Sequence, residues 1–514
     1  MTQQADAVVL SGAGLERGRL VDIARGGAPV QLAPDALARV DAARDCIERR
    51  LASGEVFYGI NTGFGALSSV HIAPEQLAEL QLNLIRSHAC GVGAALPDEV
   101  VRAVLALRIQ TMLRGHSGVR RHTVELMRDC LNHGICPLVP ERGSVGASGD
   151  LAPLAHIALA LIGEGRVRQA GRELPAAEAF AAAGLEPLRP EAKEGLCLIN
   201  GTQVMCATGL LLCQDAEHLL RTADVAAAMT VDATRGTPVA FAASIQAVRP
   251  HPGQADSAAN LRAMLADSRI RESHRDCDRV QDPYSLRCAP QVHGAIRDAF
   301  AHVESTLVRE ANASTDNPLV FAERDEILSG GNFHGEPVAL VLDYLAIALT
   351  ELANIAERRI EKLVDPNMSG LPPFLARDPG LNSGYMIPQV VAAALASENK
   401  VLAHPAAADS IPTSAEKEDH VSMGMNAALK LRQVVRNTAT VLAIELLCAA
   451  DALELLQPVE GGRGVRAGRQ RVRRFAAPME RDRSLAAEIE ALADDVLGGG
   501  LLAAVEQQLD APLR

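Results

Sequence analysis

Long amphipathic runs dominate the second half of the chain. In these runs apolar residues recur every three or four positions, which is the pattern of a helix that buries one face. The runs extend from Gln203 to Met229, Gln291 to Ala311, Pro337 to Leu363, Tyr385 to Ala403 and Val421 to Leu455. We predict that each is a helix and that together they form a long helical bundle.

The first half has a different pattern, in which short helical stretches alternate with irregular, glycine-rich loops. The most notable loops are Phe57–Gly65 and Gly143–Asp150. The second loop leads into an apolar helical run, Leu151–Ile162, and Asp150 is predicted to cap its N-terminus. Loops of this kind on a rigid scaffold commonly carry function. We therefore expect two regions, an N-terminal domain over residues 1–199 and a helical-bundle domain over residues 200–514.

The composition supports a large, mainly α protein. The chain has 514 residues, of which 48% are hydrophobic and only 3% aromatic, with no tryptophan. Its net charge is −13, and the one basic concentration, from Arg463 to Arg474, is predicted to be a solvated loop that leads into a helix. We expect no nucleic-acid partner.

Several features favour a reducing, cytoplasmic location. The first residues, Met1 to Asp6, lack the basic and apolar segments of a secretory signal, and we expect charged or turn residues to interrupt each apolar run before it could span a membrane. The 10 cysteines include no CxxC pair, so we expect reduced thiols that mostly pack in the core. His274 and Cys277 are weak evidence for a metal without a second pair of ligands, and we expect no required metal and no membrane partner.

The tripeptide Ala147-Ser148-Gly149 has unusual chemical potential. Gly149 has no Cβ, so its backbone nitrogen can approach the carbonyl carbon of Ala147 closely. If that ring closes and Ser148 then loses water, the product is a methylidene-imidazolone, an electron-poor alkene. Ordinary side chains are not electrophilic, and enzymes that need an electron sink otherwise use a cofactor. The tripeptide therefore suggests an enzyme.

Two other kinds of functional loop share part of this glycine-rich pattern. A nucleophile elbow needs the pattern G-x-S-x-G, whereas Gly149 follows Ser148 directly. A phosphate-binding loop needs Lys and Ser or Thr after its last glycine, where this chain has Asp150. Both are excluded, which leaves a cyclising loop or a plain glycine-rich turn before a helix.

Several segments together resemble the aromatic amino acid ammonia-lyase and aminomutase family. They are Phe57–Gly65, Asn83–Gly91, Gly143–His156, Lys193–Gln203, Val280–Cys288, Ser329–Gly335 and Glu418–Met423. Members of this family are mainly α, with a smaller N-terminal domain that carries the methylidene-imidazolone (MIO) and a long central helical bundle. They are homotetramers whose active sites are shared between subunits. The resemblance thus implies a homotetramer and an MIO group made from Ala147, Ser148 and Gly149, with no external cofactor.

The resemblance also implies roles for individual residues. Tyr58 matches the catalytic base, and Asn200 matches an asparagine that hydrogen-bonds near MIO. Tyr284 matches a catalytic tyrosine, and Arg287 matches the arginine that clamps the substrate carboxylate. Both tyrosines also stand out without the family, because the chain has only 4 and these two lie in polar segments that packing explains poorly.

The remaining matches concern the substrate. Gln281 lies on the segment of the clamp, and Phe333 matches a residue packed near MIO. His88 matches a residue that contacts an imidazole, and Glu418 matches an acid that faces the polar end of the substrate. These residues imply elimination of ammonia from L-histidine, a small-molecule substrate, to give trans-urocanate.

Two alternatives remain open from the sequence. The chain has Glu416-Lys417 where many histidine-specific members have Asn-Gln, and Lys417 could pair with Glu416 or Glu418. A tyrosine or phenylalanine ammonia-lyase or aminomutase of the same family is therefore the nearest alternative. A helical assembly that keeps the fold without the chemistry is the second.

Overall fold

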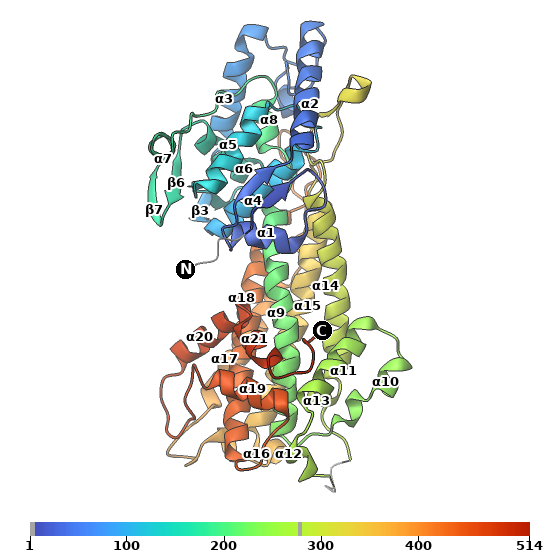
Figure 1. Cartoon of the computed structure of the whole chain (residues 1–514), viewed down its shortest axis with the longest axis vertical. Coiled ribbons are helices and arrows are strands. Elements are labelled where there is room, and N and C mark those ends of the chain that lie inside the picture. Colours follow the sequence, from blue (N-terminus) through green and yellow to red (C-terminus); the bar gives the residue numbers. More distant parts are fainter. Residues whose placement is uncertain (1–5, 276–279) are drawn as a thin grey trace. The chain divides into compact units, whose positions relative to one another are not determined.

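Helices make up most of the regular structure, as Figure 1 shows. The structure is a computed structural model that describes residues 6–275 and 280–514, so Cys277 lies outside the described residues. All five long helices predicted from the sequence are present. They are α9 (Gln203–Ala233), α14 (Ala289–Ala311), α15 (Glu336–Val364), α17 (Met386–Leu402) and α18 (Gly424–Leu455). The mainly α fold class is confirmed.

The described residues form two compact units, and each is discontinuous in sequence. The first contains the described residues up to Gln214 together with Glu304–Asp343 and Pro405–Leu429. The second contains Asp215–Val303, Tyr344–His404 and Lys430–Arg514. The division between residues 199 and 200 that the sequence suggested stays a prediction.

The first unit consists of helices with four small sheets. Its helices are α1 (Arg17–Ala24), α2 (Pro34–Ala52), α3 (Leu77–His88), α4 (Asp98–Met112), α5 (Arg121–Asn132), α6 (Leu151–Leu161), α7 (Ala176–Ala183) and α8 (Glu194–Ile199), with short 3-10 turns at Gly65–Leu67, Pro74–Gln76 and Ala322–Arg324. Its strands are β1 (Val8–Leu10), β2 (Val30–Leu32), β3 (Val92–Ala95), β4 (Cys136–Pro137), β5 (Pro140–Arg142), β6 (Arg166–Gln169), β7 (Arg172–Pro175), β8 (Leu319–Phe321) and β9 (Glu326–Leu328). Strands β1 and β2 are parallel, whereas the pairs β3–β5, β4–β6, β6–β7 and β8–β9 are antiparallel.

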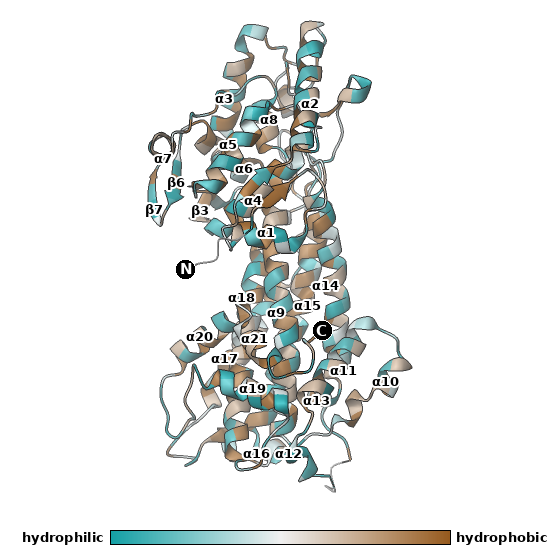
Figure 2. Cartoon of the chain, in the orientation of Figure 1, coloured by the Kyte–Doolittle hydropathy of each residue, from teal (hydrophilic) through white to brown (hydrophobic). Residues whose placement is uncertain are grey.

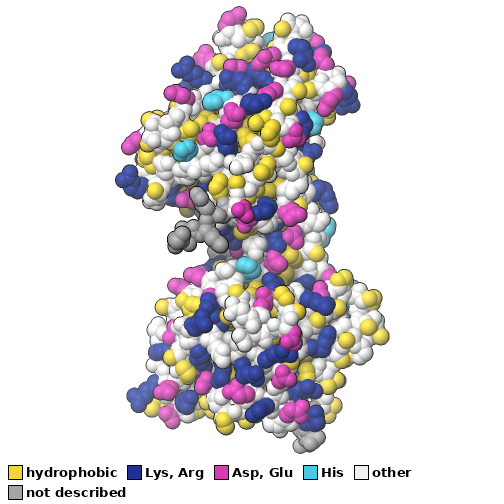
Figure 3. All heavy atoms as spheres, in the orientation of Figure 1, with side chains coloured by type: hydrophobic (Ala, Val, Ile, Leu, Met, Phe, Trp, Pro, Cys, Tyr) yellow, Lys and Arg dark blue, Asp and Glu magenta, His cyan; other side chains and the backbone are white. Residues whose placement is uncertain are grey.

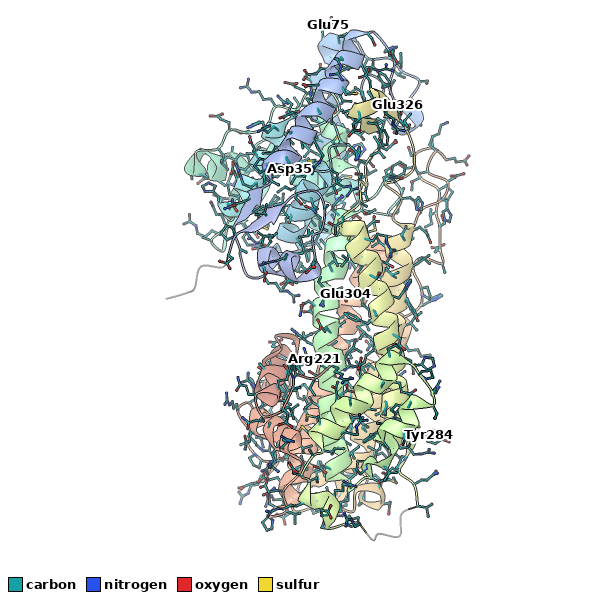
Figure 4. All side chains as sticks on the ribbon, turned by 45° about the vertical axis from the view of Figure 1, so that its right-hand side comes forward. Asp35, Glu75, Arg221, Tyr284, Glu304 and Glu326 are labelled. Atoms are coloured by element: carbon teal, nitrogen blue, oxygen red, sulfur yellow. The ribbon has the colours of Figure 1, made fainter. Side chains whose placement is uncertain are left out.

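The later segments join this unit through specific contacts. Glu304, labelled in Figure 4, accepts a hydrogen bond from Arg17 Nε at 2.6 Å. Helices α3, α6 and α8 pack against one another. Leu154, Ile157 and Leu161 of α6 are buried, and burying each such side chain contributes about 1.5–3 kcal/mol. The group of helices α3, α6 and α8 therefore provides a rigid support for the residues at their ends.

The second unit has further helices and a buried polar network. Its shorter helices are α10 (Ala243–Ala247), α11 (Pro252–Met264), α12 (Arg269–Glu272), α13 (Tyr284–Arg287), α16 (Pro366–Ser369), α19 (Arg463–Val472), α20 (Ala486–Leu497) and α21 (Gly500–Glu506), with 3-10 turns at Pro238–Phe241 and Pro373–Leu375. In the network, Asp224 on α9 accepts hydrogen bonds from Ser257 Oγ at 2.6 Å and Arg297 at 2.7 Å, and its carboxylate lies 2.7 Å from His293 Nδ1. Arg359 on α15 forms a two-point pair with Glu445 on α18, at 2.6 and 2.9 Å.

The protonation of this network follows from its geometry. Arg359 can only donate, and its guanidinium lies 3.1 Å from His293 Nε2, so Nε2 is an acceptor and Nδ1 carries the proton that faces Asp224. Burial lowers the pKa of His293, in agreement with a neutral ring. Burial alone would raise the pKa of Asp224, but Arg297, His293 and Ser257 outweigh it and hold that pKa well below its usual value.

Helix α15 differs from the expectation that no apolar run is long enough to cross a membrane. Among the described helices it alone has an 18-residue window that passes that test by length and composition. In the structure, 72% of this window is buried, as in the core helix of a folded domain. Figure 2 shows hydrophobic and hydrophilic residues together on the long helices, which is the amphipathic pattern that such packing requires.

The cysteines agree with the prediction, whereas the basic segment is already helical at Arg463 and is not a solvated loop. Arg463–Val472 forms helix α19, and Arg471 and Arg473 pair with Asp495 and Asp451. On the face shown in Figure 3, cationic and anionic side chains are interspersed. The nine described cysteines are all free, and most of them are buried, with Cys90 exposed.

Candidate active site

A cavity of about 1280 Å³ in the first unit brings together most of the candidate residues. Seven of them line it: Tyr58, His88, Ala147, Ser148, Asn200, Phe333 and Glu418. They come from loops before α3, α6 and α15, from the C-terminal ends of α3 and α8, and from the segment before α18. Residues from six separate stretches of the chain thus meet at one site.

The glycine at position 149 is required by the backbone around it. Gly149 has a φ of +74°, and a Cβ there would lie 2.1 Å from the carbonyl oxygen of Gly201. Asp150 N donates to that same oxygen at 2.7 Å, and Gly201 N donates to the Ser148 carbonyl at 3.4 Å. The loop is thus held directly against the segment that follows α8.

The other end of the loop is held by the segment before α18. Ser422 Oγ and Gly335 N both donate to the carbonyl oxygen of Gly146, at 3.1 and 3.3 Å. Met423 N donates to Val145 O at 2.8 Å. Ser422 and Met423 lay within a motif of the sequence but had been included in the predicted helix. Helix α18 begins only at Gly424, because Met423 has a φ of +56°.

The role predicted for Asp150 needs correction. Asp150 is at the position before α6, but its side chain makes no capping bond to that helix. Its Oδ2 instead accepts from Val204 N and Met205 N, both at 2.9 Å, in the first turn of α9. Asp150 therefore caps a helix more than 50 residues away. Burial raises its pKa to about 6, against the hydrogen bonds that favour the charged form.

Glu418 lies directly beside the serine of the tripeptide. Ser148 Oγ donates to Glu418 Oε1 at 3.1 Å, and Thr413 Oγ1 donates to Oε2 at 2.6 Å. Main-chain bonds between Thr413 and Glu418 close the intervening turn. Lys417 is exposed, and in the described part of the chain it forms no ion pair with Glu416 or Glu418. The carboxylate is therefore oriented by Thr413, not by Lys417.

His88 lies at the C-terminal end of α3, on the same cavity. Its Nδ1 lies 2.9 Å from the Leu84 carbonyl oxygen and 3.0 Å from Ser87 Oγ. A proton on Nδ1 satisfies the carbonyl, which leaves Nε2 as an acceptor. Burial lowers the pKa of His88, although Leu84 and Glu418 act in the opposite direction. A neutral His88 can thus accept a hydrogen bond from a ligand.

Tyr58 and Asn200 complete the polar wall. Gly65 N donates a hydrogen bond to Tyr58 Oη at 3.2 Å, which fixes the position of the phenol oxygen. Asn200 is 3% exposed, and its Oδ1 has no hydrogen-bond partner in the described residues. A buried amide oxygen without a partner is costly, so this atom is suited to a ligand that brings its own donor.

Four candidates do not line this cavity: Gly149, which directly follows Ser148 in its loop, and three residues of the second unit. Arg287 is half-buried, donates to the main-chain oxygen of Asp282 at 3.0 Å and lies 4.6 Å from the centre of the Tyr284 ring. Tyr284, labelled in Figure 4, is 72% exposed, and Gln281 is also exposed. A large exposed aromatic side chain in contact with an arginine is typical of a binding surface.

Comparisons with known proteins identify the family of this chain. The family model described as aromatic amino acid lyase matches residues 15–474. A histidine ammonia-lyase of Myxococcus xanthus is 53% identical, with 97% of this chain and 98% of the relative covered. The crystal structure of histidine ammonia-lyase from Trypanosoma cruzi has a TM-score of 0.91 and 43% identity, covering 98% of this chain and 96% of that one.

A tyrosine aminomutase from Streptomyces globisporus is similar in fold, with a TM-score of 0.94, 38% identity, and coverage of 99% of this chain and 100% of that one. The family match thus extends over both the cavity and the second unit. The chain belongs to the aromatic amino acid lyase family.

Proposed function

We propose that the protein is a histidine ammonia-lyase, which eliminates ammonia from L-histidine to give trans-urocanate, the first step of histidine degradation. The observation that carries the proposal is the placement of Glu418 and His88 on one cavity with Ser148. A carboxylate and a neutral imidazole are suited to the two nitrogens of a substrate imidazole. Relatives that are 52–55% identical along nearly the whole chain bear the same name.

We propose further that Ala147, Ser148 and Gly149 form MIO, with no external cofactor. The nitrogen of Gly149 attacks the Ala147 carbonyl carbon, and that oxygen leaves as water. Ser148 then loses its hydroxyl and its α-hydrogen as a second water. The residues fit this group, because Gly149 lies where no Cβ has room and because Ala147 is small and packs against Val421 and Met423. Once formed, the group supplies an electrophilic alkene that captures the amine of the substrate.

The other residues of the cavity handle protons and orientation. Tyr58 removes the β-proton of the substrate, and the hydrogen bond from Gly65 N holds its phenol oxygen in place. His88 and Glu418 hold the imidazole, and Phe333 packs against the reacting end of the cavity. Asn200 Oδ1 accepts from a donor that arrives with the substrate.

The substrate carboxylate needs a cationic clamp, and the described residues that line this cavity include no arginine and only one lysine, the exposed Lys417. We propose a homotetramer with shared active sites, in which another copy supplies Arg287 as the clamp, with Tyr284 and Gln281 beside it. The exposure of Tyr284 supports this arrangement, as do exposed apolar side chains of α15 and α17. Those side chains are Leu340, Tyr344, Ile347, Met386, Ile387, Val390, Val391 and Val401.

We propose that the protein acts in the cytoplasm, without a nucleic-acid, membrane or metal partner. The free thiols of the nine described cysteines support a reducing compartment. The mixed charges of the visible surface support the absence of a nucleic-acid site.

The alternative is a tyrosine-specific lyase or aminomutase, which the TM-score of 0.94 to a tyrosine aminomutase favours. The test is the ultraviolet absorbance of purified protein incubated separately with L-histidine, L-tyrosine and L-phenylalanine, which follows the conjugated acrylate product. We expect absorbance to rise only with histidine, and a rise with tyrosine would support the alternative. The intact mass provides the control, because wild type should lack two waters relative to its sequence and Ser148→Ala should not lose them.

A further inference from the structure

A fully buried ion pair lies directly behind Asn200 in the first unit. Lys193 and Asp316 both have side chains that are 0% exposed, and Lys193 Nζ lies 3.3 Å from Asp316 Oδ2. The ammonium also donates to the Ser117 carbonyl at 2.7 Å and to Cys197 Sγ at 3.0 Å. Each of the three ammonium protons thus has an acceptor, so Lys193 needs no hydrogen bond to water.

The charge state of the pair follows from these contacts. Burial alone would lower the pKa of Lys193, but Asp316 and Cys197 outweigh it and raise the pKa above its ordinary value. Burial raises the pKa of the Cys197 thiol to about 12, so it stays protonated and donates to Ser117 O at 3.0 Å. The cluster is therefore an ammonium, a carboxylate and a neutral thiol.

A stabilising role alone explains this pair poorly. Removing two charges from water costs several kcal/mol per ion, and replacing a buried pair by apolar residues is often neutral for stability. The ion pair does, however, hold the Asp316 carboxylate in a fixed position. Asp316 Oδ1 accepts from Asn317 N at 2.7 Å and lies 3.5 Å from Asn200 Nδ2.

These contacts decide which way the Asn200 amide faces. Its Nδ2 donates to the Asn317 carbonyl at 3.2 Å and points toward the Asp316 carboxylate, so both neighbours on that side are acceptors. The main chain of Asn200 is held separately, because Arg108 Nη1 donates to the Asn200 carbonyl oxygen at 2.9 Å. With the NH₂ group turned inward, Oδ1 is left as the atom without a partner, on a residue that lines the cavity.

We propose that Lys193 and Asp316 are positioning residues, which lock the Asn200 amide so that its oxygen accepts a hydrogen bond from the amino group of the substrate. Lys193 fixes the carboxylate, Asp316 fixes Asn317 and the amide nitrogen, and a reversed amide would present a donor to the substrate ammonium. This assignment rests on the proposed function for the identity of the substrate, but its geometry involves only this chain.

The test uses two double variants that both remove the ion pair. Changing one partner alone would leave an unpaired buried charge and unfold the protein, so Lys193→Met is combined with Asp316→Asn or with Asp316→Leu. Asparagine keeps an acceptor for Asn317 and Asn200, whereas leucine removes it. We expect kcat for L-histidine to stay within about threefold of wild type with asparagine and to fall about 10- to 100-fold with leucine, the cost of misplacing a reacting-site group.

A second measurement separates positioning from a general loss of structure. In an Asn200→Ala background the leucine variant should cause less than about a threefold further loss, because its effect passes through Asn200. In a Ser148→Ala background, which cannot turn over, calorimetry should show weaker binding of L-histidine with leucine and unchanged binding of urocanate, which has no amine.

The outcomes are distinct. Equal losses in the two double variants, or a full loss that persists without Asn200, would overturn the assignment. A wild type that acts on tyrosine instead of histidine would refute the proposed substrate alone, and the same variants would then be compared with tyrosine.

Discussion

The contact between Gly149 and Gly201 gives a sharp prediction for Gly149→Ala. A non-glycine residue at a φ of +74° costs about 1–2 kcal/mol. The new Cβ would also lie 2.1 Å from Gly201 O and 2.3 Å from Gly201 C, both backbone atoms that cannot rotate away. Relief of such an overlap costs about 1–3 kcal/mol more. The geometry in which the Gly149 nitrogen can close the ring is therefore destabilised by about 2–5 kcal/mol, which lowers its population roughly 30-fold to several-thousand-fold.

The assay is intact-mass spectrometry of freshly purified protein, followed by absorbance with L-histidine. We expect most Gly149→Ala molecules to retain the mass of both waters. The rate of urocanate formation should fall in proportion to the fraction of molecules that contain MIO. Gly171→Ala is a matched control, because Gly171 has a φ of +76° in the turn between β6 and β7 and nothing lies within 4 Å of its Cβ position. It carries the same backbone strain without the collision.

The Gly171→Ala control should form MIO and turn over substrate like wild type, with about 1–2 kcal/mol less stability. If Gly149→Ala forms MIO as completely as Gly171→Ala, the close approach of residues 149 and 201 plays no part in ring closure, which would refute the prediction.

Three other variants test separate parts of the structure. Tyr58→Phe should lower kcat far more than it raises KM, and steady-state kinetics with an unchanged kcat would exclude Tyr58 as the base. Thr413→Val removes the 2.6 Å hydrogen bond to Glu418 and should lower kcat/KM for histidine about tenfold, while Thr413→Ser restores it; equal activity of the two would show that the hydroxyl does not orient Glu418. Asp224→Asn should cost about 3–5 kcal/mol at neutral pH. The partners of Asp224 depress its pKa in the folded state, so the stabilisation is fully present above the pKa of the unfolded state, about 3.9, and is lost as the pH falls below that value. The denaturation curves of the variant and the wild type should therefore converge in acid.

The long helices were predictable because their signal is local. Apolar residues at helical spacing from Gln203 onward predict α9 almost to its ends, and the same holds for α14 and α15. The start of α18 was misplaced because the left-handed Met423 follows from its bond to Val145, a residue almost 280 positions earlier in the chain.

The site was predictable from motifs but not from periodicity. Resemblance singled out His88 and Glu418, yet no spacing rule could show that both face one cavity with Ser148. The cap that Asp150 supplies to α9 was not predicted, because Asp150 directly precedes α6 and its sequence position therefore favoured a cap on α6. Lys193 lay within one of the motifs and Asp316 within none, and the sequence did not indicate that they pair, because an ion pair across more than 100 residues is a property of the folded chain.

If MIO forms as proposed, it leaves a permanent chemical record that a chain has folded, because two distant segments hold the Gly143–Asp150 loop in place. Residues Gly201 and Ser422 reach the loop only after later parts of the chain have been synthesised and packed. A chain that has never folded should therefore keep an intact Ser148. A chain that has folded once should lack the mass of two waters permanently, even after denaturation. The fraction of dehydrated chains in a cell extract would then measure how many chains have ever folded, independently of how many are folded at the moment of measurement.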